Sequence, residues 1–209
     1  MRRIILNEFA NNGYQQEADK GNWLFFRHGQ YEDYWIVWFG EFDLNEQNSL
    51  YEAFLNEFAG RFPTIKKNTS LIIVSANDTV SVSEILAIEN DPYLFKKYFL
   101  KYSDEALSDL LELLSDEEGK LKPVEELMIL PESFGKLKEE TDIEAEPYYL
   151  LYKIGHKMPF LPVRVDHKEA ISTDLQLPDN MQECLEWCMG LGDGRDQRLS
   201  ELESFSKEE

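Results

Sequence analysis

The chain has 209 residues, 43% of them hydrophobic and 13% aromatic, and its 41 acidic and 21 basic side chains give a formal net charge of −20. This aromatic content excludes a chain that is disordered throughout, and the length suits one domain, or one domain with a small appendage. The negative charge disfavours strong nucleic-acid binding, because it repels phosphate groups.

The excess negative charge is concentrated in the middle of the chain. Residues 1–102 carry 14 acidic and 10 basic side chains, residues 103–146 carry 15 and 4, and residues 147–209 carry 12 and 7, so the net charges are −4, −11 and −5. We predict three regions from this division: an α/β core, an acidic helical and loop region, and a C-terminal part. The predicted fold class is α+β, with a small mixed sheet flanked by helices.

The N-terminal region begins with a predicted helix and a hairpin. The apolar side chains of residues 2–11 can share one helical face. Residues 22–27 and 33–39 are rich in aromatic and β-branched side chains, and the polar segment between them contains Gly29. This composition predicts two antiparallel strands joined by a hairpin loop.

A second helix and a central strand follow the hairpin. Leu50, Phe54 and Phe58 recur at helical intervals, which predicts a helix over residues 46–60. Residues 70–75 form an uninterrupted apolar run of strand length. Because such a run implies that both faces are covered, we expect this strand to be central in the sheet.

Residues 91–102 form the most distinctive segment, and a short helix that begins at Ser81 or Ser83 precedes them. Asp91 suits a helix cap, Pro92 suits the first helical position, and aromatic side chains follow at intervals of three and four residues. The pattern predicts a helix with an aromatic stripe and a basic edge. Two interpretations stay open: a core helix with a solvated basic edge, or an element that docks on a partner.

The acidic region begins with a helix that Ser103 caps, and its periodicity weakens after residue 116. Residues 139–146 contain many acidic side chains and almost no apolar side chain to bury. We therefore expect a solvated loop there, or a segment that a partner orders.

The C-terminal part returns to the composition of strands. Residues 148–154 and 160–165 are predicted to form a strand pair, in which Pro162 places the second strand at an edge. A final helix begins at Asp179, and a charged tail over residues 195–209 follows it.

Cofactor sites and targeting segments are not indicated by the sequence. Cys184 and Cys188 are the two cysteines, and no histidine lies at metal-ligand spacing from them, which favours buried structural thiols. No segment has the pattern of a signal peptide or the apolar length of a membrane helix. We expect a cytoplasmic protein without a membrane partner, cofactor or bound metal.

No recognised catalytic motif supports an enzyme. The sequence lacks a glycine-rich phosphate loop between a strand and a helix, a serine nucleophile elbow and a zinc-binding His-Glu-x-x-His motif. The order helix, hairpin, helix, strand is compatible with a metal-dependent nuclease whose candidate acids are Glu41, Asp43 and Asp78. No carboxylate-x-lysine pattern accompanies them, so a noncatalytic protein is predicted and the nuclease stays an alternative.

A resemblance to a known family rests on the sequence Glu89-Asn90-Asp91-Pro92-Tyr93, followed by Phe95-Lys96-Lys97 and by Tyr102-Ser103 before a leucine-rich helix. This pattern resembles the middle component of bacterial three-component ABC ATPase systems, a group that includes the Lamassu-type anti-phage and anti-plasmid systems. The resemblance covers about residues 1–115. It implies a noncatalytic adaptor that joins an SMC/Rad50-like ABC ATPase to an effector, often a nuclease, and restrains the effector until foreign DNA is sensed.

The resemblance also implies a partner-binding surface, for which the candidate residues are Asp91, Tyr93, Phe95, Lys96, Lys97 and Tyr102. Of these, Phe95 is the one most expected to belong to the core. Replacement of both Lys96 and Lys97 by glutamate is predicted to abolish complex formation and to leave the isolated protein folded. A second hypothesis is an acidic inhibitor or immunity-like protein that blocks a basic nucleic-acid-binding partner.

Overall fold

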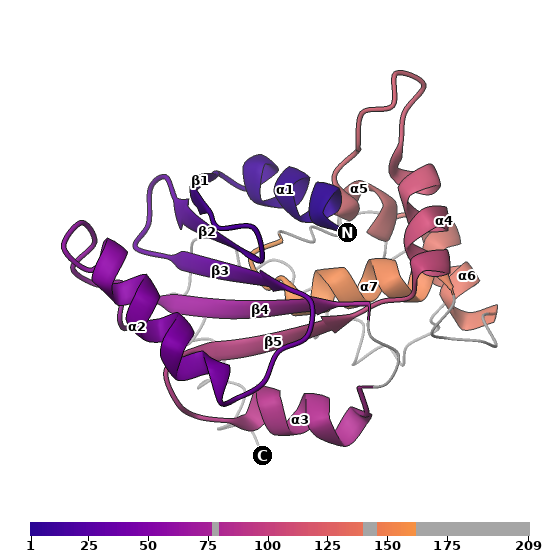
Figure 1. The fold of residues 1–209 in the computed structure, drawn as a ribbon. Coiled ribbons are helices and arrows are strands. Elements are labelled where there is room, and N and C mark those ends of the chain that lie inside the picture. Colours follow the sequence, from indigo (N-terminus) through magenta and orange to yellow (C-terminus); the bar gives the residue numbers. More distant parts are fainter. Residues whose placement is uncertain (77–79, 140–145, 162–209) are drawn as a thin grey trace, which may run out of the picture. The chain divides into compact units, whose positions relative to one another are not determined.

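Figure 1 shows the computed structural model of the chain, which describes residues 1–76, 80–139 and 146–161. Its centre is a five-stranded sheet with the order β1-β2-β3-β4-β5. The strands are β1 (Tyr14–Asp19), β2 (Trp23–His28), β3 (Tyr34–Phe39), β4 (Thr69–Ser75) and β5 (Lys96–Lys101). The first three pair antiparallel, whereas β3, β4 and β5 run parallel. The predicted mixed sheet, with its hairpin and central strand, is confirmed.

Helices cover both faces of this sheet, which confirms the predicted α+β class (Figure 1). The described helices are α1 (Arg2–Asn11), α2 (Glu46–Phe58), α3 (Val82–Asn90), α4 (Asp104–Leu114), α5 (Val124–Met128), α6 (Pro131–Glu139) and α7 (Pro147–Lys157). Side chains of α2 and α3 pack on one face, and side chains of α1, α4, α5 and α7 pack on the other. The described part of the acidic middle region contains α4, α5 and α6, with a loop between α4 and α5.

The sheet separates two apolar cores because side chains alternate along each strand. On β3, Trp35 and Val37 face the core under α1 and α7, whereas Ile36 faces the core under α2. On β4, the run from Leu71 to Val74 is buried on both sides. The prediction of a central, fully covered strand is confirmed by this burial.

The predicted helix over residues 91–102 is wrong, because the structure has a turn followed by strand β5. The aromatic side chains do recur at helical intervals, but on the strand Phe99 and Leu100 enter opposite cores. A strand that is buried on both faces needs no polar alternation, so a short apolar run cannot be distinguished from a helix by periodicity. The aromatic content of β5 suits a pleated surface.

The predicted strand over residues 148–154 is also wrong, because these residues lie in helix α7. Aromatic and branched side chains suggested a strand, but Pro147 occupies the first turn of the helix, and Leu150, Leu151 and Ile154 are buried on one side of it. Phe160 and Leu161, the described residues of the predicted second strand, form a turn and not a strand. Residues 162–165 lie outside the described residues.

Strand β1 was not predicted, because its sequence is mostly polar and lacks the alternation of polar and large apolar residues that indicates a strand. Its pairing with β2 is interrupted at Glu17, where the register shifts between Gln16 and Ala18. Several other predictions fall outside the described residues: Asp78, the two cysteines, the helix that begins at Asp179, the charged tail, and residues 140–145 of the acidic loop.

Glu8 of α1 is a fully buried carboxylic acid at the contact between α1 and the start of α5. Its Oε1 atom accepts hydrogen bonds from the Val124 N–H at 3.2 Å and from the Asn7 side chain at 3.1 Å, whereas Oε2 has no partner. Burial raises the pKa of Glu8 to about 7, although both hydrogen bonds oppose the shift. The Glu8 side chain is therefore protonated over much of the acidic pH range.

None of the helices in the described ranges combines the length and the hydrophobicity that a helix needs to cross a bilayer.

Candidate partner-binding surfaces

The turn before β5 is built around the buried ammonium group of Lys97. Its side chain has no solvent exposure, and Nζ donates to the carbonyl oxygens of Asp91, Tyr93 and Phe95 at 3.1, 2.7 and 3.2 Å. The same atom lies 3.4 Å from the Asp91 carboxylate. Burial lowers the pKa of Lys97, and the neighbouring carboxylate opposes this shift. We call residues 91–97 the lysine-clamped turn.

Asp91 connects this turn to helix α2. Its carboxylate accepts hydrogen bonds from the Gln47 side chain at 2.9 Å and from the Tyr93 N–H at 3.0 Å. Burial alone would raise the pKa of Asp91, but these hydrogen bonds and the Lys97 charge outweigh it, so the pKa lies below its usual value. Leu94 completes the turn with a φ of 64°, a conformation that is costly for a branched side chain.

The clamped backbone displays Tyr93, which is 70% exposed, beside the exposed Lys96. The Lys96 ammonium lies 5.1 Å from the centre of the Tyr98 ring, a cation–π distance. An exposed aromatic side chain on a fixed backbone loses little conformational freedom when it is covered, and it therefore suits a protein contact.

The structure brings five of the six predicted surface residues together and separates the sixth. Phe95 belongs to the core, as expected, with 4% exposure, and Tyr102 lies half-buried beyond the other end of β5. Lys97 is inside the protein and not on its surface, so its replacement by glutamate is now expected to destabilise the fold. A carboxylate there would face Asp91 and three carbonyl oxygens.

Sequence reasoning missed Gln47 and Leu94, which help to hold the turn. Gln47 is separated from Asp91 by 44 residues along the chain, and no local pattern indicates their contact. The positive φ of Leu94 has no sequence signal either, because glycine or asparagine is the usual residue in that conformation.

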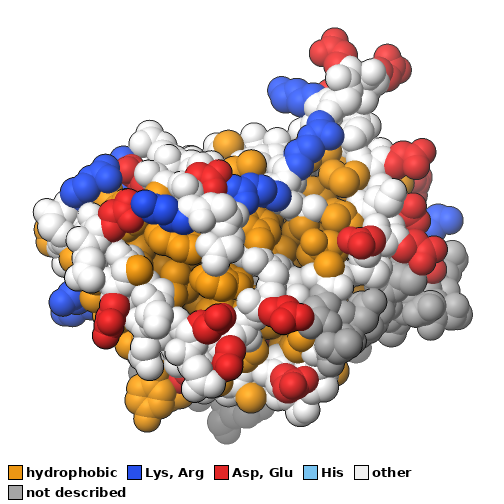
Figure 2. Space-filling view, in the orientation of Figure 1, with side chains coloured by type: hydrophobic (Ala, Val, Ile, Leu, Met, Phe, Trp, Pro, Cys, Tyr) orange, Lys and Arg blue, Asp and Glu red, His pale blue; other side chains and the backbone are white. Residues whose placement is uncertain are grey.

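A second surface feature lies past the end of β3, between the β3–α2 loop and α3. It is a cleft of about 600 Å³, which we call the strand-end groove. Its apolar lining comes from Phe42, Leu44, Val80, Ala87, Ile88 and Phe99. Its acidic rim comes from Glu41, Asp43, Glu46 and Glu84. In Figure 2, acidic side chains gather over the region between α2 and α3, next to hydrophobic surface.

Two of the groove acids are held in the ionised form by local hydrogen bonds. The backbone and side-chain N–H groups of Asn45 lower the pKa of Asp43. The hydroxyl and N–H groups of Ser81 lower the pKa of Glu84, as part of the capping box that begins α3. Their negative charges therefore persist below neutral pH.

The candidate nuclease acids Glu41 and Asp43 both lie at this groove, whereas Asp78 is outside the described residues. Within the described ranges, no group of three or more His, Cys, Asp or Glu side chains is arranged to hold a metal ion. The acids past β3 thus form the rim of a cleft with an apolar floor.

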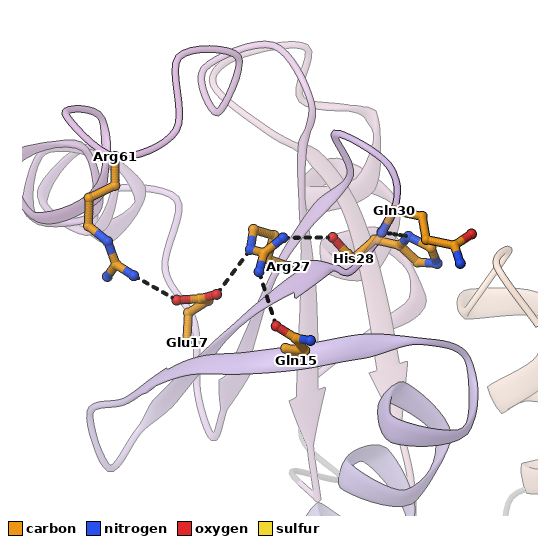
Figure 3. Close-up of polar contacts among 6 residues, drawn as sticks. All are labelled: Gln15, Glu17, Arg27, His28, Gln30 and Arg61. Carbon is orange, nitrogen blue, oxygen red and sulfur yellow. Dashed lines mark hydrogen bonds and ion pairs between the residues drawn. The ribbon is translucent and has the colours of Figure 1, made fainter.

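A third polar feature links strands β1 and β2 to the end of α2 (Figure 3). The Glu17 carboxylate lies between two guanidinium groups, 3.0 Å from Arg27 and 2.9 Å from Arg61. Arg27 also donates to the Gln15 side chain at 3.0 Å and to the carbonyl of the following residue, His28. Because these groups bond to one another, this network holds the edge strand and is less suited to a ligand.

The architecture is a five-stranded mixed sheet with helices on both faces (Figure 1), and it carries two candidate partner-binding surfaces. Residues 33–123 match the model of a family described as ABC-three component (ABC-3C) system Middle Component 1. The match runs from the start of β3 to the loop before α5 and contains both the lysine-clamped turn and the strand-end groove. It supports the resemblance to a middle component that the sequence indicated. No curated protein and no solved structure matches the chain.

Proposed function

We propose that this protein is a noncatalytic adaptor subunit of a bacterial ABC three-component system. It links an SMC/Rad50-like ABC ATPase to an effector, a nuclease in the simplest case, and restrains the effector until foreign DNA is sensed. The family match over residues 33–123 carries this proposal. We further propose that the system belongs to the Lamassu-type anti-phage or anti-plasmid defences and acts in the cytoplasm.

The lysine-clamped turn supports an adaptor function by its construction. A buried ammonium group and a leucine with positive φ both cost stability, and such features persist where the surrounding structure over-determines them. Here they fix the backbone that presents Tyr93 and Lys96. We therefore assign these two side chains, and not Lys97, to direct contact with a partner.

The adaptor function is tested by co-expression of the full chain with the ATPase and effector encoded beside it. We expect the three proteins to elute together in size-exclusion chromatography. An ATPase and effector that assemble without this chain, or a chain that elutes alone beside them, would contradict the proposal.

The contact surface is tested by the double variant Tyr93→Ala with Lys96→Glu. We expect a loss of co-purification of about tenfold or more, because the variant removes the exposed ring and reverses the adjacent charge. The matched control is Phe134→Ala with Lys136→Glu, which makes the same kinds of change at exposed positions of α6, outside the family match. Equal co-purification of both variants would rule out the turn as the contact.

The alternatives make different predictions. A metal-dependent nuclease should cleave plasmid DNA with Mg²⁺ and lose this activity with Asp43→Ala. An acidic inhibitor should bind an isolated basic nucleic-acid-binding protein and block it without any ATPase. We expect neither activity from the purified chain.

A further inference from the structure

The strand-end groove combines an apolar floor with an acidic rim. Its floor includes Phe42 and Leu44, which are only partly covered by the protein, together with buried Ile88 and Phe99. Its rim places four carboxylates around this apolar floor. Carboxylates that serve solubility alone have no need to surround a hydrophobic cleft.

The negative charge of the rim is not neutralised locally at Asp43 and Glu84. The groups that hydrogen-bond to these two carboxylates belong to Asn45 and Ser81, which are neutral. Among the described residues that line the groove, none is lysine, arginine or histidine. The groove therefore presents net negative charge and apolar surface at the same place.

These properties select one class of occupant by charge complementarity. Nucleic acid is repelled by the rim, and a simple cation makes no use of the apolar floor. An amphipathic segment satisfies both, because its lysine or arginine side chains can pair with the rim while a large apolar side chain covers the floor. We propose that the strand-end groove binds a basic amphipathic segment of a partner protein. This inference rests on the proposed adaptor function, which requires a partner.

The groove adjoins the lysine-clamped turn at the start of α2. The rim residue Glu46 precedes Gln47, whose side chain donates to the Asp91 carboxylate at 2.9 Å. The groove residues Ala87 and Ile88 lie on α3 just before the turn. The two surfaces are therefore neighbours on the side of the sheet that α2 and α3 cover.

The test uses a short synthetic peptide of lysine and leucine with an amphipathic pattern, titrated into the full chain at about 150 mM salt and followed by fluorescence anisotropy. The groove variant is Glu46→Gln with Glu84→Gln, in which glutamine can still complete the capping box of α3. The matched control is Asp109→Asn with Glu112→Gln on the exposed face of α4. We expect the groove variant to weaken binding about tenfold and the control to change it less than twofold.

Equal weakening by both variants, or by neither, would overturn the inference, because binding would then follow net charge and not the groove. Binding of Mg²⁺ that the same groove variant abolishes would overturn it as well, in favour of a metal site. The peptide result does not depend on complex assembly. Groove-specific binding with no ATPase co-purification would therefore uphold the groove and refute the adaptor function.

The partner segment itself is identified by a photo-reactive phenylalanine analogue at Leu44 in the assembled complex. We expect a crosslinked peptide from a partner subunit that carries lysine or arginine next to a large apolar side chain. An acidic peptide, nucleic acid, a second copy of this chain, or no crosslink in an intact complex would overturn the inference while the adaptor function still holds.

Discussion

The lysine-clamped turn and the strand-end groove use charge in opposite ways. At the turn, the Lys97 ammonium is buried, and carbonyl oxygens and the Asp91 carboxylate bond to it. At the groove, Asp43 and Glu84 are exposed, and among the described residues the groups that hydrogen-bond to them are neutral. The buried charge therefore fixes the shape of the backbone, and the exposed charges remain available for recognition. The comparison predicts that changes to the buried Lys97 alter stability, whereas changes at the groove rim alter binding.

The largest effect is expected for Lys97→Met. The variant leaves the Asp91 carboxylate and three carbonyl oxygens without their cation, which should cost about 3–5 kcal/mol of unfolding free energy. Urea denaturation followed by tryptophan fluorescence measures it. Lys96→Met at the adjacent exposed position is the control and should change stability by less than about 0.5 kcal/mol. A cost below about 1 kcal/mol for Lys97→Met would show that the ammonium does not hold the turn.

The second effect concerns Glu8, a buried acid that contrasts with the exposed acids of the groove. The pKa of Glu8 in the folded state is about 7, above the usual value of a glutamate. At pH values between the usual pKa and about 7, the folded state therefore holds a proton that the unfolded state has released. The contribution of Glu8 to stability should therefore fall as the pH rises from about 4.5 to about 7 and then stay constant.

Glu8→Gln removes this dependence and keeps an acceptor for the Val124 N–H. The gain over the wild type should be near zero at pH 4 and reach at most about 3 kcal/mol above pH 7. Urea denaturation at several pH values checks it. Glu84→Gln should give no such gain at high pH, because the pKa of Glu84 is lowered and its carboxylate is exposed. A pH-independent difference between wild type and Glu8→Gln would refute the assignment.

A smaller effect is expected for Ser81→Ala, which connects the groove to the stability of α3. The Ser81 hydroxyl caps the helix by accepting the Glu84 N–H, and its loss should cost about 1 kcal/mol. Because Ser81 also orients the Glu84 carboxylate, the variant should weaken binding of the basic peptide. Ser108→Ala on α4 provides a control that should not destabilise the protein. Unchanged stability and peptide affinity in Ser81→Ala would show that this cap is unimportant.

The smallest effect is expected for Glu17→Gln in the network of Figure 3. The variant weakens the ion pairs of Glu17 with Arg27 and Arg61. It should cost less than about 1 kcal/mol of unfolding free energy, because solvent reaches these pairs and the Arg61 side chain is 57% exposed. The cost should shrink at high salt, since water and ions screen exposed charges. Urea denaturation at low and high salt measures both. A cost as large as that of Lys97→Met would remove the contrast between surface and buried charge.

Sequence reasoning succeeded where one local signal determines the structure. The composition of β2 and β3, with the polar segment between them, indicated a hairpin, and the unbroken run in β4 indicated a central strand. Ser103 and the spacing of the α4 leucines gave the start and buried side of that helix. In these elements, residue propensity, hydrophobic pattern and capping residues indicate the same structure.

The same reasoning failed where two structures satisfy one pattern. The stripe of aromatic residues before Tyr102 fits a helix as well as a doubly covered strand, and only the contact of Gln47 with Asp91 and the clamp at Lys97 reveal the turn. Helix α7 was missed because its Tyr and Leu content resembles that of a strand. Of the predicted surface, Tyr93 and Lys96 are exposed, whereas burial removes Lys97 from it, and burial of a lysine is not visible from sequence.

The irregularity at Glu17 in strand β1 has a consequence for how the protein behaves in a crowded assembly. β1 lies at the edge of the sheet, where unpaired backbone groups invite strands of neighbouring molecules to add on. The extra residue bends that border and directs a charged side chain toward Arg27 and Arg61. Sheet extension from one copy to the next is thereby discouraged, so the protein resists edge-to-edge aggregation at high concentration.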